Sequence, residues 1–229
     1  MFLITDLYHT FLDAIFPVSA EEREVLALDS GLAFDILPRA PRCKMPLACS
    51  LFSYKDERVR RLVWAIKYKK SARAAAISAE SLFHVIHSYS QAASPIVILP
   101  MPISSQRRRE RGFNQCELMA DAIERICAVR METGSQPLII RDLLVRRRHR
   151  SRQTLKDRED RLKDSEDIFA VNEAAARKLD YLRHAPSKDS QHLILVLDDV
   201  ITTGGTIRDA IMTVRAAGFE KTFGLSLAH

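Results

Sequence analysis

The sequence predicts an α/β fold in which a mainly parallel sheet is flanked by helices. Short apolar runs alternate along the chain with longer segments whose apolar residues recur at helical spacing. Such alternation is typical of parallel strands joined by helices that pack on the sheet. The chain has 229 residues, enough to bury a full core, and we find no internal repeat. We therefore expect one main domain at 47–229, preceded by a small helical or irregular region at 1–46.

The first expected element is a short docking helix. Apolar residues from Ile4 to Ile15 lie on one helical face, which stops at a proline. Residues 18–46 are mixed in character, and three prolines exclude a long element there. A strand is expected at 47–54, and a helix follows at once because apolar residues recur at helical spacing over 59–66. The largely basic run at 67–70 suits the C-terminus of this helix.

The alternation continues along the rest of the chain. Each further helix has one apolar face, and each further strand is a short run rich in aliphatic residues. Helices are expected at 72–89, 118–126 and 207–214, and strands at 96–99, 138–140, 193–197 and 223–227.

The most informative stretch runs from Leu195 to Thr206. A buried strand stops at Asp198 and Asp199, a hydroxyl-rich turn with two glycines follows, and a helix comes next. In open α/β sheets ligands bind beyond the carboxyl ends of the strands, where these two carboxylates lie. The N–H groups and the positive dipole end of the following helix favour an anion. The stretch therefore combines acceptors for sugar hydroxyls with backbone donors for a phosphate, as a phosphorylated ribose requires.

Other interpretations of this stretch are less well supported. The sequence contains neither G-x-x-x-x-G-K-[ST] nor G-x-G-x-x-G, so a P-loop ATPase and a Rossmann fingerprint are excluded. An ordinary strand–turn–helix, whose glycines serve only the turn, is the simpler alternative. The two adjacent aspartates count against it, because clustered unpaired carboxylates at the end of a buried strand cost stability without a ligand or a cation.

At these residues the sequence resembles the signature of type I phosphoribosyltransferases, which bind phosphoribosyl pyrophosphate, usually with Mg²⁺. The resemblance implies that Asp198 and Asp199 are the catalytic acidic pair and face the 2′- and 3′-hydroxyls of the ribose. It also implies that a loop wraps the 5′-phosphate. The residues of this phosphoribosyl-binding loop are Val200, Thr202, Thr203, Gly204, Gly205 and Thr206.

Three further segments widen the resemblance and precede the loop in the chain. They are Lys67-Tyr68-Lys69, then Pro100-Met101-Pro102 with the run from Arg109 to Gln115, and then Arg147-Arg148-His149 followed by Gln153. Together they resemble the ComF/GntX family, the competence-associated branch of the phosphoribosyltransferase fold. The resemblance covers roughly 47–229, judged from the positions of the motifs.

The resemblance implies that the segment after the strand at 96–99 is the pyrophosphate loop. Guanidinium groups suit phosphate oxygens, which agrees with this assignment. The alternative is a solvated run of charge that opens a helix, with Asn114 and Gln115 capping the helix after Gly112 instead of touching a ligand. The residues that the resemblance assigns to the loop are Met101, Pro102, Ile103, Arg109 and Arg111.

The net charge of +6 comes from one basic segment. Between Arg141 and Lys163 there are ten Lys/Arg and four Asp/Glu, a surplus of six, so the rest of the chain is balanced. This segment could close over pyrophosphate as a mobile loop, contact nucleic acid through phosphates, or form a charged helix without a ligand. It has few aromatic residues, so base stacking is not evident. The candidate contacts are Arg146, Arg147, Arg148, Arg150 and Gln153.

The cysteines depart from the family pattern. ComF-like proteins usually begin with a four-cysteine zinc module, but only Cys43 and Cys49 lie in that region here. A tetrahedral zinc site needs four suitable ligands, so we expect no metal bound by protein zinc ligands. Cys116 and Cys127 fit helix positions, and we expect them to be packing residues. Four scattered cysteines, with no signal peptide and no membrane span, fit a cytoplasmic protein.

These observations lead to competing functional hypotheses. The ComF/GntX resemblance implies a protein that binds phosphoribosyl pyrophosphate or ribose 5-phosphate and acts in DNA uptake, natural transformation or use of extracellular DNA. Its partners would then include single-stranded DNA and the competence machinery. The alternative is an active phosphoribosyltransferase of nucleotide salvage, with Mg²⁺, which transfers phosphoribosyl to a nucleobase or amine that we could not identify. A sensor of phosphoribosyl pyrophosphate is the third hypothesis, but the sequence shows no separate helix-turn-helix domain.

Overall fold

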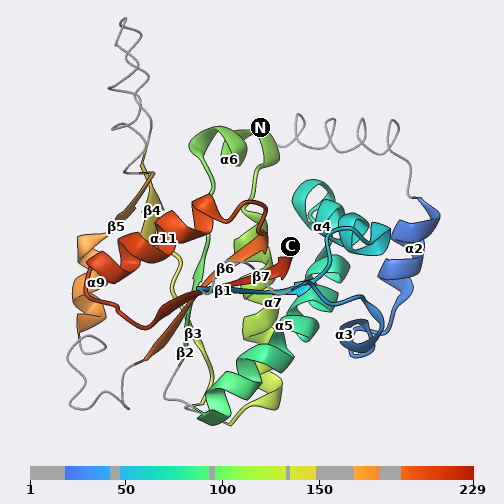
Figure 1. Cartoon of the computed structure of the whole chain (residues 1–229), viewed down its shortest axis with the longest axis horizontal. Helices are drawn as coiled ribbons and strands as arrows, with labels where there is room; N and C mark the ends of the chain where they lie inside the picture. The colour runs from blue at the N-terminus through green and yellow to red at the C-terminus, as the bar shows by residue number, and fades with distance from the viewer. Residues whose placement is uncertain (1–18, 42–46, 93–95, 133–134, 148–167, 181–191) are drawn as a thin grey trace, which may run out of the picture.

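The computed structural model describes residues 19–41, 47–92, 96–132, 135–147, 168–180 and 192–229 (Figure 1). Its main sheet has five strands in the order β1-β7-β6-β2-β3, and every pairing in it is parallel. These strands are β1 (Ala48–Phe52), β2 (Ile96–Pro100), β3 (Leu138–Ile139), β6 (Leu193–Val200) and β7 (Thr222–Ala228). The predicted α/β class is therefore confirmed.

Strand β6 is the centre of the sheet. It pairs with β2 on one side and with β7 on the other, and the side chains from Ile194 to Leu197 are all buried. The sequence predicted a strand that ended at Leu197, and this boundary was wrong by three residues. The strand continues because Asp198 and Val200 remain in register with Ser226 and Ala228 of β7.

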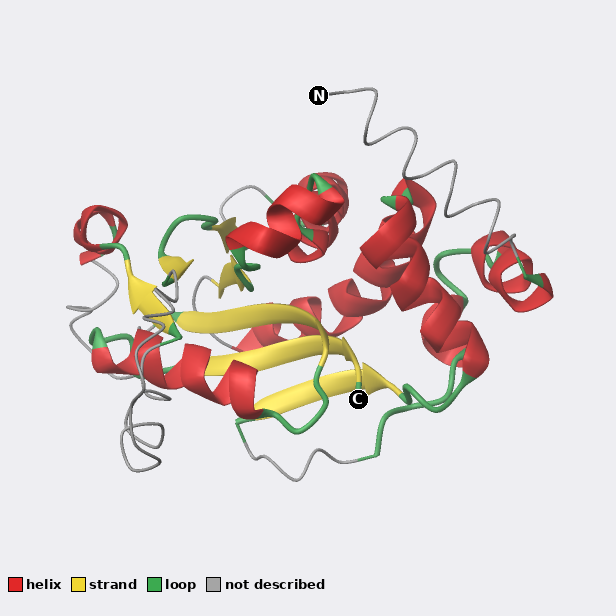
Figure 2. Cartoon of the chain, turned by 90° about the horizontal axis from the view of Figure 1, so that it is seen from above, coloured by secondary structure: helices red, strands yellow, loops and turns green. Residues whose placement is uncertain are grey.

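Helices cover both faces of the sheet (Figure 2). On one face α5 (Ala72–Ala92) and α7 (Gln115–Arg130) pack against each other and against β2, while α11 (Gly205–Ala216) packs against β6 and β7 on the other face. Helix α4 (Glu57–Lys69) follows β1 and packs against α5. It begins at Asp56, whose side chain accepts hydrogen bonds from the backbone N–H groups of Arg58 and Val59.

Several short elements were not predicted. Residues before β1 form α2 (Ala20–Ala27), which packs on α4, and α3 (Ala33–Ile36), which packs on α5. The predicted docking helix at 4–15 lies outside the described residues. The others are α6 (Ser105–Arg111), an antiparallel pair of β4 (Leu144–Arg146) with β5 (Phe169–Val171), and α9 (Glu173–Lys178).

All strands of the main sheet point the same way, so their carboxyl ends meet at one edge. The chain leaves β2 for α6 and leaves β6 for α11 at this edge, and Figure 1 shows α4, α6 and the start of α11 gathered around it. The fold therefore brings together three segments that are far apart in the sequence, as expected for a ligand site of an α/β sheet.

Candidate functional site

The acidic pair lies where β6 ends. Asp198 is half-buried, whereas Asp199 is only 4% exposed. One oxygen of each carboxylate is held by the backbone: Asp198 Oδ1 accepts from the N–H of Asp199 at 2.9 Å, and Asp199 Oδ1 accepts from the N–H of Val200 at 2.8 Å. These bonds fix the orientation of both side chains, and each leaves the second oxygen, Oδ2, without a backbone donor among the hydrogen bonds described.

Lys67, in the last turn of α4, neutralises Asp199. Its ammonium Nζ lies 3.1 Å from Asp199 Oδ2. That oxygen is buried and receives no hydrogen bond from the described residues, so the contact is an ion pair without hydrogen-bond geometry. A buried carboxylate oxygen without a hydrogen bond is rare in native structures, so the nearby ammonium is the group that offsets its charge.

Cys116, near the start of α7, contacts the other aspartate. Its thiol donates to Asp198 Oδ1 over 3.6 Å. Burial raises the pKa of this thiol well above its ordinary value, and the neighbouring Asp198 and Asp199 add to the shift. Burial, with the charge of Asp199 as a second cause, raises the pKa of Asp198 from 3.8 to about 7. The group therefore carries a proton more readily than an ordinary aspartate.

The phosphoribosyl-binding loop follows directly. Thr202, Thr203 and Thr206 are exposed, so their hydroxyls are accessible. Gly204 has a φ of 84°, in the left-handed region that only glycine adopts without strain, and it is the N-cap of α11. A glycine has no side chain to cap the helix, so the first N–H groups of α11 remain available to an anion.

The start of α11 is held close to the sheet by Gly224 of β7. A Cβ atom at Gly224 would lie 2.7 Å from Ile207 Cδ1 and 2.9 Å from Ala48 Cβ, well inside normal contact. Ile207 is buried and comes one residue after the loop. The absence of a side chain on β7 thus determines how deeply the N-terminus of α11 is seated.

The predicted pyrophosphate loop is anchored at its first residue. Met101 donates its backbone N–H to Leu197 O at 2.8 Å, and its carbonyl accepts from Asn114 Nδ2 at 3.0 Å. Asn114 also caps α7, because its Oδ1 accepts from the N–H of Cys116 at 2.9 Å. The capping interpretation of Asn114 is therefore confirmed, and the same side chain ties the loop to the helix.

The arginines of α6 do not all face the same way. Arg107 and Arg111 line the cavity at the carboxyl edge of the sheet, whereas Arg109 is exposed and is not among the lining residues. Arg111 lies over the ring of Tyr68, 5.0 Å from its centroid, and donates to Gln115 Oε1 at 3.0 Å. The predicted role of Arg109 on pyrophosphate stays a prediction, without a place in the cavity wall.

Of the predicted basic-segment contacts, Arg146 at the end of β4 lines the cavity. Burial lowers the pKa of its guanidinium, the nearby charge of Arg107 lowers it further, and Asp198 opposes the change. Arg147 is exposed and continues the pairing to β5 through a backbone bond to Ile168 O. Arg148, Arg150 and Gln153 lie outside the described residues.

These segments enclose a cavity of about 350 Å³. Two carboxylates and four cationic side chains are among the residues that line it. The lining residues that the sequence analysis assigned to the site are Asp198, Asp199, Val200, Thr202, Thr203, Gly204, Gly205, Thr206, Met101, Pro102, Ile103, Arg111 and Arg146. The other lining residues are Lys67, Tyr68, Arg107, Gln115, Ile201 and Ile207.

Sequence reasoning gave no role to three side chains that complete the site. Lys67 and Tyr68 were noticed as part of a family motif and of a basic helix C-terminus, and Cys116 only as a packing residue. Cys116 and Cys127 are indeed buried in the core, but the contact of Cys116 with Asp198 depends on tertiary placement. No local spacing in the sequence relates residues 67 and 116 to residues 198 and 199.

Metal ligands are sparse in the part of the chain that the structure describes. No three His, Cys, Asp or Glu side chains group there as they would around a protein-held ion. Cys49 is exposed and Cys43 lies outside the described residues, so the expected lack of a zinc site stays a prediction. Two neighbouring carboxylates do fit Mg²⁺ that arrives on substrate phosphates, since this ion is usually held by one or two carboxylates together with phosphate oxygens and water.

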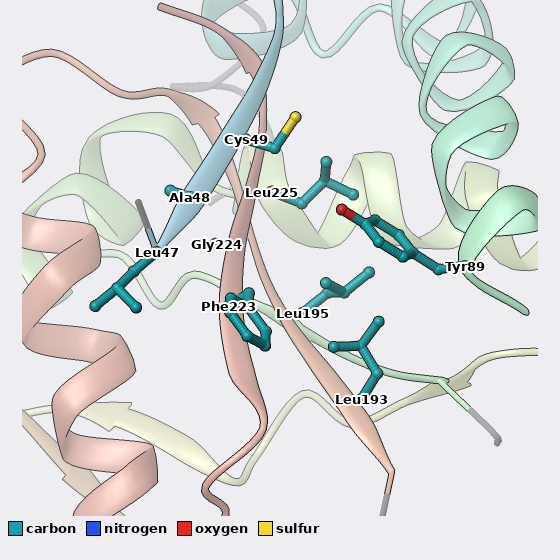
Figure 3. A pocket seen from close by; sticks show the side chains of 9 residues that line it. All are labelled: Leu47, Ala48, Cys49, Tyr89, Leu193, Leu195, Phe223, Gly224 and Leu225. Atoms are coloured by element: carbon teal, nitrogen blue, oxygen red, sulfur yellow. The ribbon is translucent and has the colours of Figure 1, made fainter. Parts of the chain in front are cut away.

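A second pocket, of about 230 Å³, lies at the opposite end of the strands. Figure 3 shows it between β1, β6, β7 and the Tyr89 side chain of α5. Its wall is mainly aliphatic and aromatic, and it has no charged lining residue. It therefore offers no charged group for a phosphate. In the described residues no helix combines the length and apolar character that crossing a bilayer requires.

The fold, a mainly parallel five-stranded sheet flanked by helices, is consistent with a type I phosphoribosyltransferase-like architecture. No family model matches the chain. Among curated proteins, it is similar to the competence protein ComFC of Bacillus subtilis (strain 168), with 31% identity over 114 residues. The match covers 50% of this chain and 36% of ComFC, so the chain spans little more than a third of the length of that relative. The similarity is distant, and it supports a competence-related family with a phosphoribosyltransferase-like fold.

Proposed function

We propose that this protein binds phosphoribosyl pyrophosphate or ribose 5-phosphate in the cavity at the carboxyl edge of its sheet. The 5′-phosphate lies on the loop from Thr202 to Thr206 and the sugar hydroxyls meet the acidic pair. The observation that carries this proposal is that the acidic pair and a helix start without a side-chain cap line the same cavity. Hydroxyl acceptors and phosphate donors thus line one cavity.

The arginines support the larger of the two ligands. Arg107, Arg111 and Arg146 line the cavity together with the acidic pair. Guanidinium groups bind phosphate oxygens through paired hydrogen bonds, so these arginines would hold the pyrophosphate of phosphoribosyl pyrophosphate. When bound, Mg²⁺ would neutralise charge on the pyrophosphate, and Asp198 is the half-buried carboxylate that could hold it.

The biological role follows from the family likeness. We propose that the chain is a ComF/GntX-type protein of the cytoplasm that acts with the competence machinery in DNA uptake, natural transformation or use of extracellular DNA. The motifs quoted above and the similarity to ComFC support this role. Arg146 and Arg147 support contact with the phosphates of single-stranded DNA, because they begin the basic segment beside the cavity.

Catalysis is the second candidate function. The acidic pair and the arginines line one cavity, so the ribose hydroxyls and the pyrophosphate of one ligand could be bound there together. As the bond between the anomeric carbon and the pyrophosphate oxygen breaks, the arginines would stabilise the departing pyrophosphate while an acceptor nitrogen bonds to that carbon. The acceptor is a nucleobase or another amine.

Calorimetric titration with ribose 5-phosphate and phosphoribosyl pyrophosphate, with and without Mg²⁺, tests the binding proposal. We expect both ligands to bind and the binding to be lost in Asp198→Asn/Asp199→Asn, with circular dichroism as the control for folding. Unchanged affinity of this variant would remove the acidic pair from the site.

Two further assays separate the roles. Release of pyrophosphate from phosphoribosyl pyrophosphate in the presence of a panel of nucleobases would establish the enzyme, and silence across the panel would count against it. Single-stranded DNA should bind more weakly as salt rises and after Arg146, Arg147, Arg148 and Arg150 are all replaced by Gln. Equal DNA affinity of that variant would refute the contribution of the basic segment.

A further inference from the structure

Lys67 occupies a position that the rest of the site does not explain. Its ammonium lies 3.1 Å from Asp199 Oδ2, and its side chain, 22% exposed, also borders the cavity. The adjacent Tyr68 lies under the guanidinium of Arg111, and Lys69 pairs at 3.2 Å with Glu22 of α2, which is 2% exposed. The last turn of α4 is therefore held from two sides, so the place of the Lys67 ammonium is built into the fold.

The Lys67 ammonium offsets the negative charge of the acidic pair as a whole, and not that of Asp199 alone. Asp199 Oδ1 is already taken by the N–H of Val200, so its remaining oxygen faces Lys67. Asp198 is the preceding residue of β6, and its side chain lines the same cavity as Lys67. One cation thus lies against two adjacent acidic side chains and offsets one negative charge of the pair.

This charge balance matters for an anionic sugar. Ribose 5-phosphate carries a phosphate dianion, and its ring must come within hydrogen-bond distance of the acidic pair. Two uncompensated carboxylates would repel it, and a divalent cation is the usual remedy because hard cations bind carboxylate and hydroxyl oxygens. An ammonium at the same carboxylate performs this neutralisation without a metal.

We propose that Lys67 is the resident counter-ion of the acidic pair and that it allows ribose 5-phosphate to bind without a divalent cation. The inference rests on the proposed function and deepens it. The two ligands then differ in their requirement for Mg²⁺. Ribose 5-phosphate binds without the ion, and phosphoribosyl pyrophosphate requires it because of its pyrophosphate group.

Calorimetric titration of the full chain with ribose 5-phosphate, in EDTA and in excess Mg²⁺, tests the proposal. The wild type is expected to bind equally in both. Lys67→Met is expected to bind about tenfold to a hundredfold more weakly in EDTA, the loss typical of a charged contact, and to recover most of the affinity in Mg²⁺. Lys70→Met is the matched control, because Lys70 lies over the ring of Phe113 and is not among the residues that line the cavity.

A second variant separates the counter-ion role from a structural one. In Lys67→Met/Asp199→Asn both charges of the pair are absent, so Mg²⁺ is expected to make no difference to the affinity of this variant. Circular dichroism and thermal melting report whether the variants are folded. If Lys67→Met does not fold, Lys67→Gln provides the test, and its affinity is expected to fall in EDTA and to recover in Mg²⁺.

The outcomes are distinct. Equal weakening of Lys67→Met with and without Mg²⁺, or no weakening at all, would overturn the counter-ion role while leaving the proposed function intact. A wild type that binds ribose 5-phosphate only with Mg²⁺ would do the same. A wild type that binds neither ribose 5-phosphate nor phosphoribosyl pyrophosphate in either buffer would overturn the proposed function and this inference together.

Discussion

Replacing Gly224 by alanine tests how the sheet seats the phosphoribosyl-binding loop. The added Cβ would lie 2.7 Å from Ile207 Cδ1, 3.0 Å from Ile207 Cγ1 and 2.9 Å from Ala48 Cβ. Carbon atoms in good contact are about 3.5–4.0 Å apart, so α11 and β1 must each withdraw by roughly 1 Å. Ile207 is buried in the helix layer that packs on β7, and Ala48 belongs to β1, which is hydrogen-bonded to β7 in the same sheet, so either movement disturbs packing or strand pairing.

The expected cost follows from this crowding. Overpacking of a core by one methyl group costs about 1–3 kcal/mol, which for a chain of this length lowers Tm by roughly 3–10 °C. Withdrawal of α11 also misplaces the N–H groups that face the 5′-phosphate, and we expect the affinity for ribose 5-phosphate to fall about tenfold. Urea denaturation measures the first effect and calorimetry the second.

A compensating substitution makes the reasoning testable. Ile207→Val removes the Cδ1 atom that meets the new methyl group, and by itself costs about 0.5–1.5 kcal/mol. Gly224→Ala/Ile207→Val should therefore lose less stability than the sum of the single losses, by about 1 kcal/mol. Strict additivity, or a Gly224→Ala protein as stable as the wild type, would show that the close approach of Gly224 and Ile207 does not seat α11.

Three other outcomes are expected. Gly204→Ala should destabilise the protein by about 1–2 kcal/mol because Gly204 has a positive φ. Gly205→Ala should leave thermal stability unchanged, because its Cβ would be 3.9 Å from the nearest atom. Equal melting temperatures of the two variants would contradict this expectation. Because the pKa of Asp198 is raised to about 7 from 3.8 unfolded, its favourable contribution is complete below pH 3.8 and is lost as pH rises through 7. Asp198→Asn should therefore gain stability relative to the wild type between pH 4 and pH 8 in urea titrations, and a constant difference would refute the shift. Arg111→Ala should lower the affinity for phosphoribosyl pyrophosphate about tenfold in calorimetry, whereas Arg109→Ala should not, because Arg111 lines the cavity and Arg109 does not. The reverse result would assign the pyrophosphate contact to Arg109.

The sequence was most informative where one local pattern determines both structure and chemistry. The strand–aspartate–glycine pattern predicted β6, the loop and α11, because hydrophobic periodicity and glycine positions are local properties. The strand boundary was missed at Asp198, since acidic residues ordinarily end a strand and only the pairing with β7 keeps them in one. The short pair β4 and β5 was missed for the same reason: a strand of three residues has almost no periodicity of its own.

The site was predictable as a set of ligand-facing segments and not as a set of contacts. The pairing of Lys67 with Asp199 joins residues on different elements, and so does the contact between Cys116 and Asp198. These contacts depend on how α4 and α7 pack against the edge of the sheet, which no run of residues specifies. The same limit applies to Arg109 and Arg111. Their side chains are chemically identical, and they differ only in the direction in which each leaves α6.

The strand order has a consequence for how the molecule is made. β7, the last of the described strands to be synthesised, lies between β1 and β6, so the first strand has no partner in the main sheet until the final one has been translated. A nascent chain that lacks β7 would expose the edges of both β1 and β6. Such pairing between distant parts of a chain slows folding and leaves unpaired edges open to wrong partners. The acidic pair would therefore take up its final arrangement late, when β7 closes against the strand that carries it.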